Sequence, residues 1–96
     1  MTRLWVRLMK KQRIVRHLTV PCEMGDVMEA LGEVCRQMDV PRPLWLPKNE
    51  REFTAFRQTA FTEDHFLEQI DFDRLEIEWI DDIRRKSNDP RNDFGF

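Results

Sequence analysis

The stretch that decides the fold class is Val27-Met28-Glu29-Ala30-Leu31-Gly32-Glu33-Val34-Cys35-Arg36-Gln37-Met38. Its apolar residues recur at helical spacing and fall within an arc of about 120° on a helical wheel. They are Val27, Met28, Leu31, Val34, Cys35 and Met38. Asp26 can cap the N-terminus of such a helix, and Pro41 disfavours helix at the residue before it. We therefore expect an amphipathic helix that buries one face.

Strand patterns lie on both sides of this helix. Residues 74–80 alternate strictly, so that Leu75, Ile77 and Trp79 share one face. Residues 3–9 also alternate, and residues 13–20 are rich in β-branched side chains up to Pro21, which cannot donate to a ladder. The sequence therefore predicts an N-terminal hairpin and a C-terminal strand.

The register of this hairpin can be argued from its charges. The connection contains no Gly or Asn, so its turn signal is weak. A two-residue loop at 11–12 would set Arg7 opposite Arg16, which is a repulsive pair. A three-residue loop removes that pair, and it sets Leu8 opposite Ile14, Leu4 opposite Leu18, and Arg16 opposite Val6. We expect the three-residue loop, which leaves Arg16 on the inner face; either Arg16 then has an acidic partner there or this register is wrong.

The middle of the chain is punctuated by prolines. Residues 40–47 are expected to be extended, with a short strand at Leu44-Trp45-Leu46. Pro47 suits the first turn of a second helix that turns Phe53 and Phe56 inward. Residues 57–61 fit no single pattern, and Thr62 can cap a helical turn over residues 63–66.

The predicted fold class is α+β, in the order β-β-α-(short β)-α-β. A small antiparallel sheet, made of the N-terminal hairpin and the C-terminal strand, carries the amphipathic helix on one face. We expect one domain over residues 1–83 and a polar, flexible tail over residues 84–96.

Composition narrows the protein class. The chain has 96 residues, 41% hydrophobic and 35% charged, which fits one globular domain. Its apolar runs reach only about three residues, so no membrane span is expected. There is no apolar stretch of secretory-signal type, and two cysteines make neither a zinc ribbon nor a disulfide framework. We expect a cytoplasmic protein with reduced thiols.

Charge is divided along the chain. Residues 1–48 hold nine basic and five acidic residues, whereas residues 49–96 hold seven basic and thirteen acidic ones. The first twenty residues contain no acid. Their six cations, the candidate contacts for a partner or nucleic acid, are Arg3, Arg7, Lys10, Lys11, Arg13 and Arg16. Such asymmetry indicates either pairing within the fold or a surface for a partner.

The divided charge allows three interpretations. In the first, Glu76 and Glu78 of the C-terminal strand pair with hairpin cations across the sheet. In the second, the two charged regions face apart and contact another protein or a second copy. In the third, the hairpin binds phosphates while Trp5 or His17 stacks on bases. A pI of about 5.7 lacks the basic excess of a dedicated nucleic-acid binder.

Catalytic and metal-binding patterns are weak. His65 and Glu68 stand at i, i+3, with Asp64, Asp71 and Asp73 nearby, which is a ligand set for a hard or borderline metal ion. No glycine follows to form a calcium loop, and an acidic loop of this kind is more often simply solvated. Three glycines and one serine leave no phosphate loop and no serine-nucleophile motif. We expect no enzyme activity, no metal and no cofactor.

Part of the chain resembles small bacterial proteins of unknown function. The resemblance covers roughly residues 44–82 and is carried by Pro43-Leu44-Trp45-Leu46, Glu52-Phe53, Asp64-His65-Phe66 and Asp71-Phe72-Asp73-Arg74-Leu75-Glu76-Ile77-Glu78-Trp79-Ile80. It implies a bacterial cytoplasmic origin and no activity. The sequence therefore predicts a non-enzymatic protein-interaction module, and the alternative is a small nucleic-acid-binding protein that uses the basic hairpin.

Overall fold

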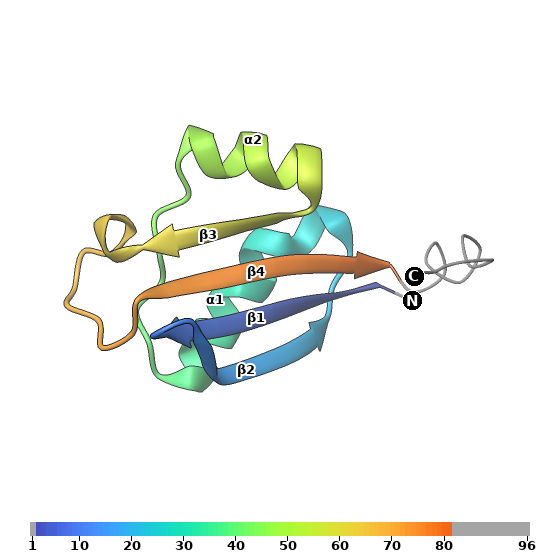
Figure 1. Cartoon of the computed structure of the whole chain (residues 1–96). Helices are drawn as coiled ribbons and strands as arrows, with labels where there is room; N and C mark the ends of the chain where they lie inside the picture. The colour runs from blue at the N-terminus through green and yellow to red at the C-terminus, as the bar shows by residue number, and fades with distance from the viewer. Residues whose placement is uncertain (1, 82–96) are drawn as a thin grey trace.

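The computed structural model describes residues 2–81, which form a four-stranded antiparallel sheet with two α-helices (Figure 1). The elements are β1 (Thr2–Lys10), β2 (Arg13–Pro21), α1 (Val27–Met38), α2 (Pro47–Phe56), β3 (Gln58–Thr62) and β4 (Arg74–Asp81). Short 3-10 turns occupy Met24–Asp26 and Glu63–His65. The strand order is β2-β1-β4-β3, so β1 and β4 are central and β2 and β3 are the edges.

Helix α1 lies against one face of the sheet, as the sequence predicts (Figure 1). Alternation along β1 and β4 directs their apolar residues to this face. The core between the layers contains Leu4, Val6, Leu8, Phe61, Leu75 and Ile77 from the sheet and Val27, Leu31, Val34, Cys35 and Met38 from α1. The predicted α+β class, the antiparallel sheet and the helix on one face are confirmed.

The short strand predicted at residues 44–46 is wrong. That segment is extended but makes no ladder, and Trp45 instead packs its ring against Phe53 and Phe61. The fourth strand is β3, in the stretch whose pattern was ambiguous, where Thr59 and Phe61 are buried. The observed order is therefore β-β-α-α-β-β.

Helix α2 lies along the β3 edge of the sheet (Figure 1), which explains one wrong prediction about its faces. Pro47 occupies its first turn as expected, and the side chain of Asn49 accepts the Leu46 N–H at 3.0 Å. Asn49 and Phe53, one turn apart, are buried against the sheet, whereas Phe56 is 68% exposed. A helix that flanks an edge buries only a narrow stripe, so Phe56 does not face inward.

Helix α1 ends before Pro41 as predicted, but its N-terminus differs from expectation. Asp26 stands at the N-cap position but its side chain makes no capping hydrogen bond. The residue that follows the helix, Asp39, has a left-handed backbone (φ 59°), and its N–H donates a hydrogen bond to the Arg36 carbonyl.

Neither helix in residues 2–81 is long and apolar enough to cross a membrane. The predicted tail, residues 84–96, lies outside the described residues.

Candidate functional site

The N-terminal hairpin turns over two residues, not the predicted three. Lys11 and Gln12 both have positive φ (54° and 65°), which is the signature of a type I′ turn that suits the twist of paired strands. Neither residue is one of the glycines or asparagines that favour this backbone. The Lys11 N–H donates to the Asp73 carboxylate at 2.7 Å, so the loop before β4 holds the turn in place.

A bulge in the hairpin removes the repulsive pair that a two-residue loop would create. Lys10 pairs with Arg13 and Met9 with Ile14, but the register shifts before Leu8 pairs with Arg16. Val15 is therefore the extra residue, and Arg7 faces His17 instead of Arg16. The predicted placement of Arg16 opposite Val6 is wrong. Arg16 is exposed beside Leu8 on the α1 side of the sheet.

On the face opposite α1, here called the open face, Arg7 is neutralised by two carboxylates of β4. Its Nε donates to Glu76 Oε1 at 3.0 Å and its Nη1 to Glu78 Oε1 at 3.2 Å. Only 13% of the Arg7 side chain is exposed. The cross-strand pairing of hairpin and acidic strand is thus present at Arg7.

Glu76 is the hub of these ion pairs because Arg74 also donates to it, at 2.6 Å. Burial alone would raise the pKa of the Glu76 carboxyl, but the hydrogen bonds and positive charges of Arg74 and Arg7 outweigh burial and hold the pKa below its ordinary value. Glu76 is therefore a carboxylate fixed in its charged form and is unsuited to act as a general acid near neutral pH.

Trp5 and His17 meet on the open face but do not form a free stacking platform. Trp5 Nε1 donates to His17 Nδ1 at 3.1 Å, and the two rings are edge-to-face at 6.0 Å. The Arg7 guanidinium lies 4.3 Å from the centre of the Trp5 ring and covers one side of it. The ring that base stacking would use is thus already engaged by Arg7.

The remaining hairpin cations form a different surface from Arg3 and Arg7. Arg3 lies at the other end of β1, opposite Pro21 and Ile80. At the turn, a group of exposed residues stays together, and we call it the hairpin surface: Lys10, Lys11, Arg13, Ile14, Val15 and Arg16. Within residues 2–81, no carboxylate lies at ion-pair distance from any of its four cations. Ile14 and Val15 add exposed apolar area, at 44% and 50% exposure.

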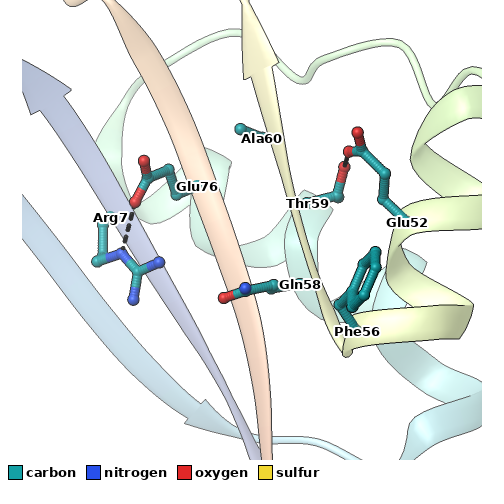
Figure 2. Close-up of a pocket in the computed structure, with 7 residues that line it drawn as sticks. All are labelled: Arg7, Glu52, Phe56, Gln58, Thr59, Ala60 and Glu76. Carbon is teal, nitrogen blue, oxygen red and sulfur yellow. Dashed lines mark hydrogen bonds and ion pairs between the residues drawn. The ribbon is translucent and has the colours of Figure 1, made fainter.

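A hollow of about 310 Å³ lies on the open face between β4, β3 and the end of α2 (Figure 2). It is lined by Arg7, Glu52, Phe56, Gln58, Thr59, Ala60 and Glu76. Its charged groups are already engaged by other residues. The Arg7 guanidinium donates to Glu76, and the Glu52 carboxylate accepts the Thr59 hydroxyl at 2.6 Å. Its lining contains no cysteine, histidine or serine, and its one hydroxyl group, on Thr59, already donates to Glu52.

The two cysteines are structural. Both are buried, and Cys35 lies on the apolar face of α1 as predicted. Burial raises the pKa of the Cys35 thiol to about 11. Burial, followed by the charges of Asp26 and Glu23, also raises the pKa of Cys22. Both thiols are therefore held away from the reactive thiolate form.

The proposed ligand set around His65 is not assembled. His65 is buried, and its Nδ1 accepts the Thr62 N–H at 3.1 Å while its Nε2 has no partner within the described chain. Asp64 and Glu68 are exposed, and Asp73 is engaged by the hairpin turn. Across residues 2–81, no three His, Cys, Asp or Glu side chains are close enough to hold a metal ion. His65 here serves to close the turn after β3.

No protein-family model, curated protein sequence or solved structure matches this chain.

The sequence pattern did not identify Ile14 and Val15 as surface residues, because β-branched residues are equally typical of buried strands. The one sequence feature that pointed to this register was the repulsion between Arg7 and Arg16 in a regular two-residue hairpin. A bulge removes that repulsion as effectively as a longer loop does.

Proposed function

We propose that the chain is a non-enzymatic protein-interaction module that contacts its partner through the hairpin surface and the adjoining edge of β2. The observation that carries the proposal is the difference between the two sheet edges. Strand β2 is a nine-residue edge with seven of its residues exposed. The other edge, β3, is covered by α2. An uncovered strand edge with exposed apolar and cationic side chains is a typical docking element.

Asn49 shows how the β3 edge is closed. Its side-chain amide is completely buried and donates to the Ala60 carbonyl at 3.1 Å and to the Thr59 hydroxyl at 3.0 Å. This arrangement satisfies a backbone acceptor that would otherwise face solvent. The part of the chain that the structure describes places no comparable group on β2.

The engaged polar groups elsewhere also support a binding role over catalysis. Arg7, Glu76 and Trp5 are locked in mutual contacts on the open face, and both thiols are buried. The hairpin surface combines cations that have no carboxylate partner with exposed apolar neighbours, and both remain free for intermolecular contact within the described residues. Because the pI of the chain is about 5.7, a protein partner is favoured over a nucleic acid.

Site-specific photo-crosslinking in native cells tests this proposal. A photoreactive amino acid replaces Val15 in one full-length variant and Arg51, an exposed residue of α2, in the control variant. We expect position 15 to yield discrete protein adducts that position 51 does not yield. Identical adducts at both positions, or adducts of nucleic acid at position 15, would refute the proposal.

A further inference from the structure

The backbone of β2 has unused hydrogen-bonding groups in a defined place. The Cys22 N–H donates to the Thr2 carbonyl at 3.2 Å, which fixes the alternation of the β1–β2 ladder. In an antiparallel ladder, alternate residues bond to the partner strand and the others point away. With the observed register, His17 and Thr19 are the residues whose N–H and C=O point away from β1.

Two details agree with this assignment. Pro21 has the same outward parity, and an edge strand accommodates proline where its missing N–H would face solvent. The Met9 carbonyl accepts from Asp73 on the β4 side, so odd-numbered residues of β1 bond away from β2. No hydrogen bond within residues 2–81 reaches the backbone groups of His17 or Thr19.

From this geometry we propose that β2 takes up an extended, acidic segment of the partner protein as a fifth strand of the sheet, an inference that rests on the function proposed above. Strand addition supplies affinity through main-chain hydrogen bonds and specificity through alternate side chains. The free stretch is bounded by the Val15 bulge and by Pro21, so the added strand pairs along Arg16–Val20. Half-buried Leu18 and Val20 offer apolar contact to its side chains on the α1 side.

Charge selects the acidic partner. Arg13 and Arg16 stand opposite Lys10 and Leu8, so both lie on the α1 side of β2. A carboxylate at the end of the added strand nearest the hairpin turn would meet them on that side, while the apolar side chains beyond it contact Leu18 and Val20. A second copy of β2 would offer these arginines no carboxylate, because β2 contains no acidic residue, and this disfavours a second copy of this chain as the occupant.

The bulge, the arginines and Pro21 are also the devices by which edge strands avoid indiscriminate pairing. Here they also restrict the choice of partner, because the arginines repel a basic strand and are complementary to an acidic one. Together these features limit which strands can pair with β2 but leave its edge uncovered, whereas α2 covers the β3 edge.

The test uses full-length protein and a synthetic probe: a nine-residue capped peptide of alternating Val and Thr with Glu at each end, so that a carboxylate can reach Arg16 whichever way the strand runs. One control peptide carries Lys in place of Glu, and a second keeps Glu but has N-methylated backbone nitrogens. We expect only the unmodified acidic peptide to bind, and its binding to slow hydrogen exchange at the His17 and Thr19 amides by at least about tenfold. Equal binding of the lysine or the N-methylated peptide would overturn the proposal, as would protection confined to other strands.

Variants locate the contact. Thr19→Pro removes one outward N–H without removing a ladder bond, so it should abolish peptide binding while the fold persists. Arg16→Glu should weaken binding at least about fivefold, whereas Arg51→Glu, the same charge change on α2, should not. If Thr19→Pro does not fold, the N-methylated peptide still decides the question. Crosslinks from position 15 without peptide binding would reject strand addition and leave the interaction module standing, whereas micromolar binding of a mixed oligonucleotide at β2 would reject both.

Discussion

Replacing Gln12 by glycine should stabilise the protein, because the hairpin turn holds this residue in a left-handed conformation. Its φ is 65°, and a non-glycine residue loses roughly 1–2 kcal/mol in this region. Glycine removes that cost but raises the entropy of the unfolded chain, which offsets about 0.5–1 kcal/mol. The middle of these two ranges gives an expected net gain in the free energy of unfolding of about 0.5–1 kcal/mol. The hydrogen bond from Lys11 N–H to Asp73 is retained because it belongs to the backbone.

Urea denaturation and thermal melting measure this gain. For a domain of 60–100 residues, 1 kcal/mol shifts Tm by about 4–8 °C, so we expect Gln12→Gly to raise Tm by about 2–8 °C. The same substitution at Gln37, an exposed position of α1, is the control and should lower stability by about 1 kcal/mol. An unchanged or lower Tm for Gln12→Gly would show that the turn is not strained and that the two-residue register is misassigned.

Three further predictions address the core, the ion pairs and the nucleic-acid alternative. Leu31→Ala should cost about 2–5 kcal/mol in chemical denaturation because Leu31 is 1% exposed at the centre of α1; an unchanged midpoint would contradict its core position. Glu76→Gln should be less stable than wild type at pH 7, and the gap should narrow as the pH falls below 4.5 and through the lowered pKa of Glu76; a gap that stays constant however far the pH falls would show that charge is not its source. Fluorescence anisotropy should give a Kd for mixed oligonucleotides no tighter than roughly 10⁻⁴ M at physiological salt. Micromolar affinity that is lost in Lys11→Ala would favour the nucleic-acid interpretation.

Elements whose burial follows a simple period could be predicted from the sequence. The α1 residues and the alternation of Leu75 and Ile77 each place apolar side chains on one face, and the observed helix and strand follow them. Strand β3 was missed because its five residues are too few for a clear period. The inward orientation of Phe56 failed because a helical pattern does not reveal that the helix will flank a sheet edge.

The hairpin register lies beyond local sequence rules. Lys11 and Gln12 have little intrinsic preference for left-handed backbone, and the turn is held partly by Asp73, 62 positions along the chain. The ion pairs of Arg7 were predictable because opposite charges on neighbouring strands attract. The lack of a carboxylate partner for Arg13 and Arg16 was not predictable. It depends on β2 being an edge strand, and the strand order is known only from the assembled sheet.

The two edges show why the candidate site belongs to β2. At β3, one buried residue, Asn49, satisfies an outward carbonyl and α2 shields the rest of the strand. At β2, the outward groups of His17 and Thr19 remain exposed to water, and exposed cations flank them. Backbone N–H and C=O groups that are hydrogen-bonded to water add little free-energy penalty in the unbound protein. They can form hydrogen bonds with an added strand once that strand displaces the water. An edge of this kind is stable alone and can still pair, and under the proposal of strand addition its arginines favour an acidic strand.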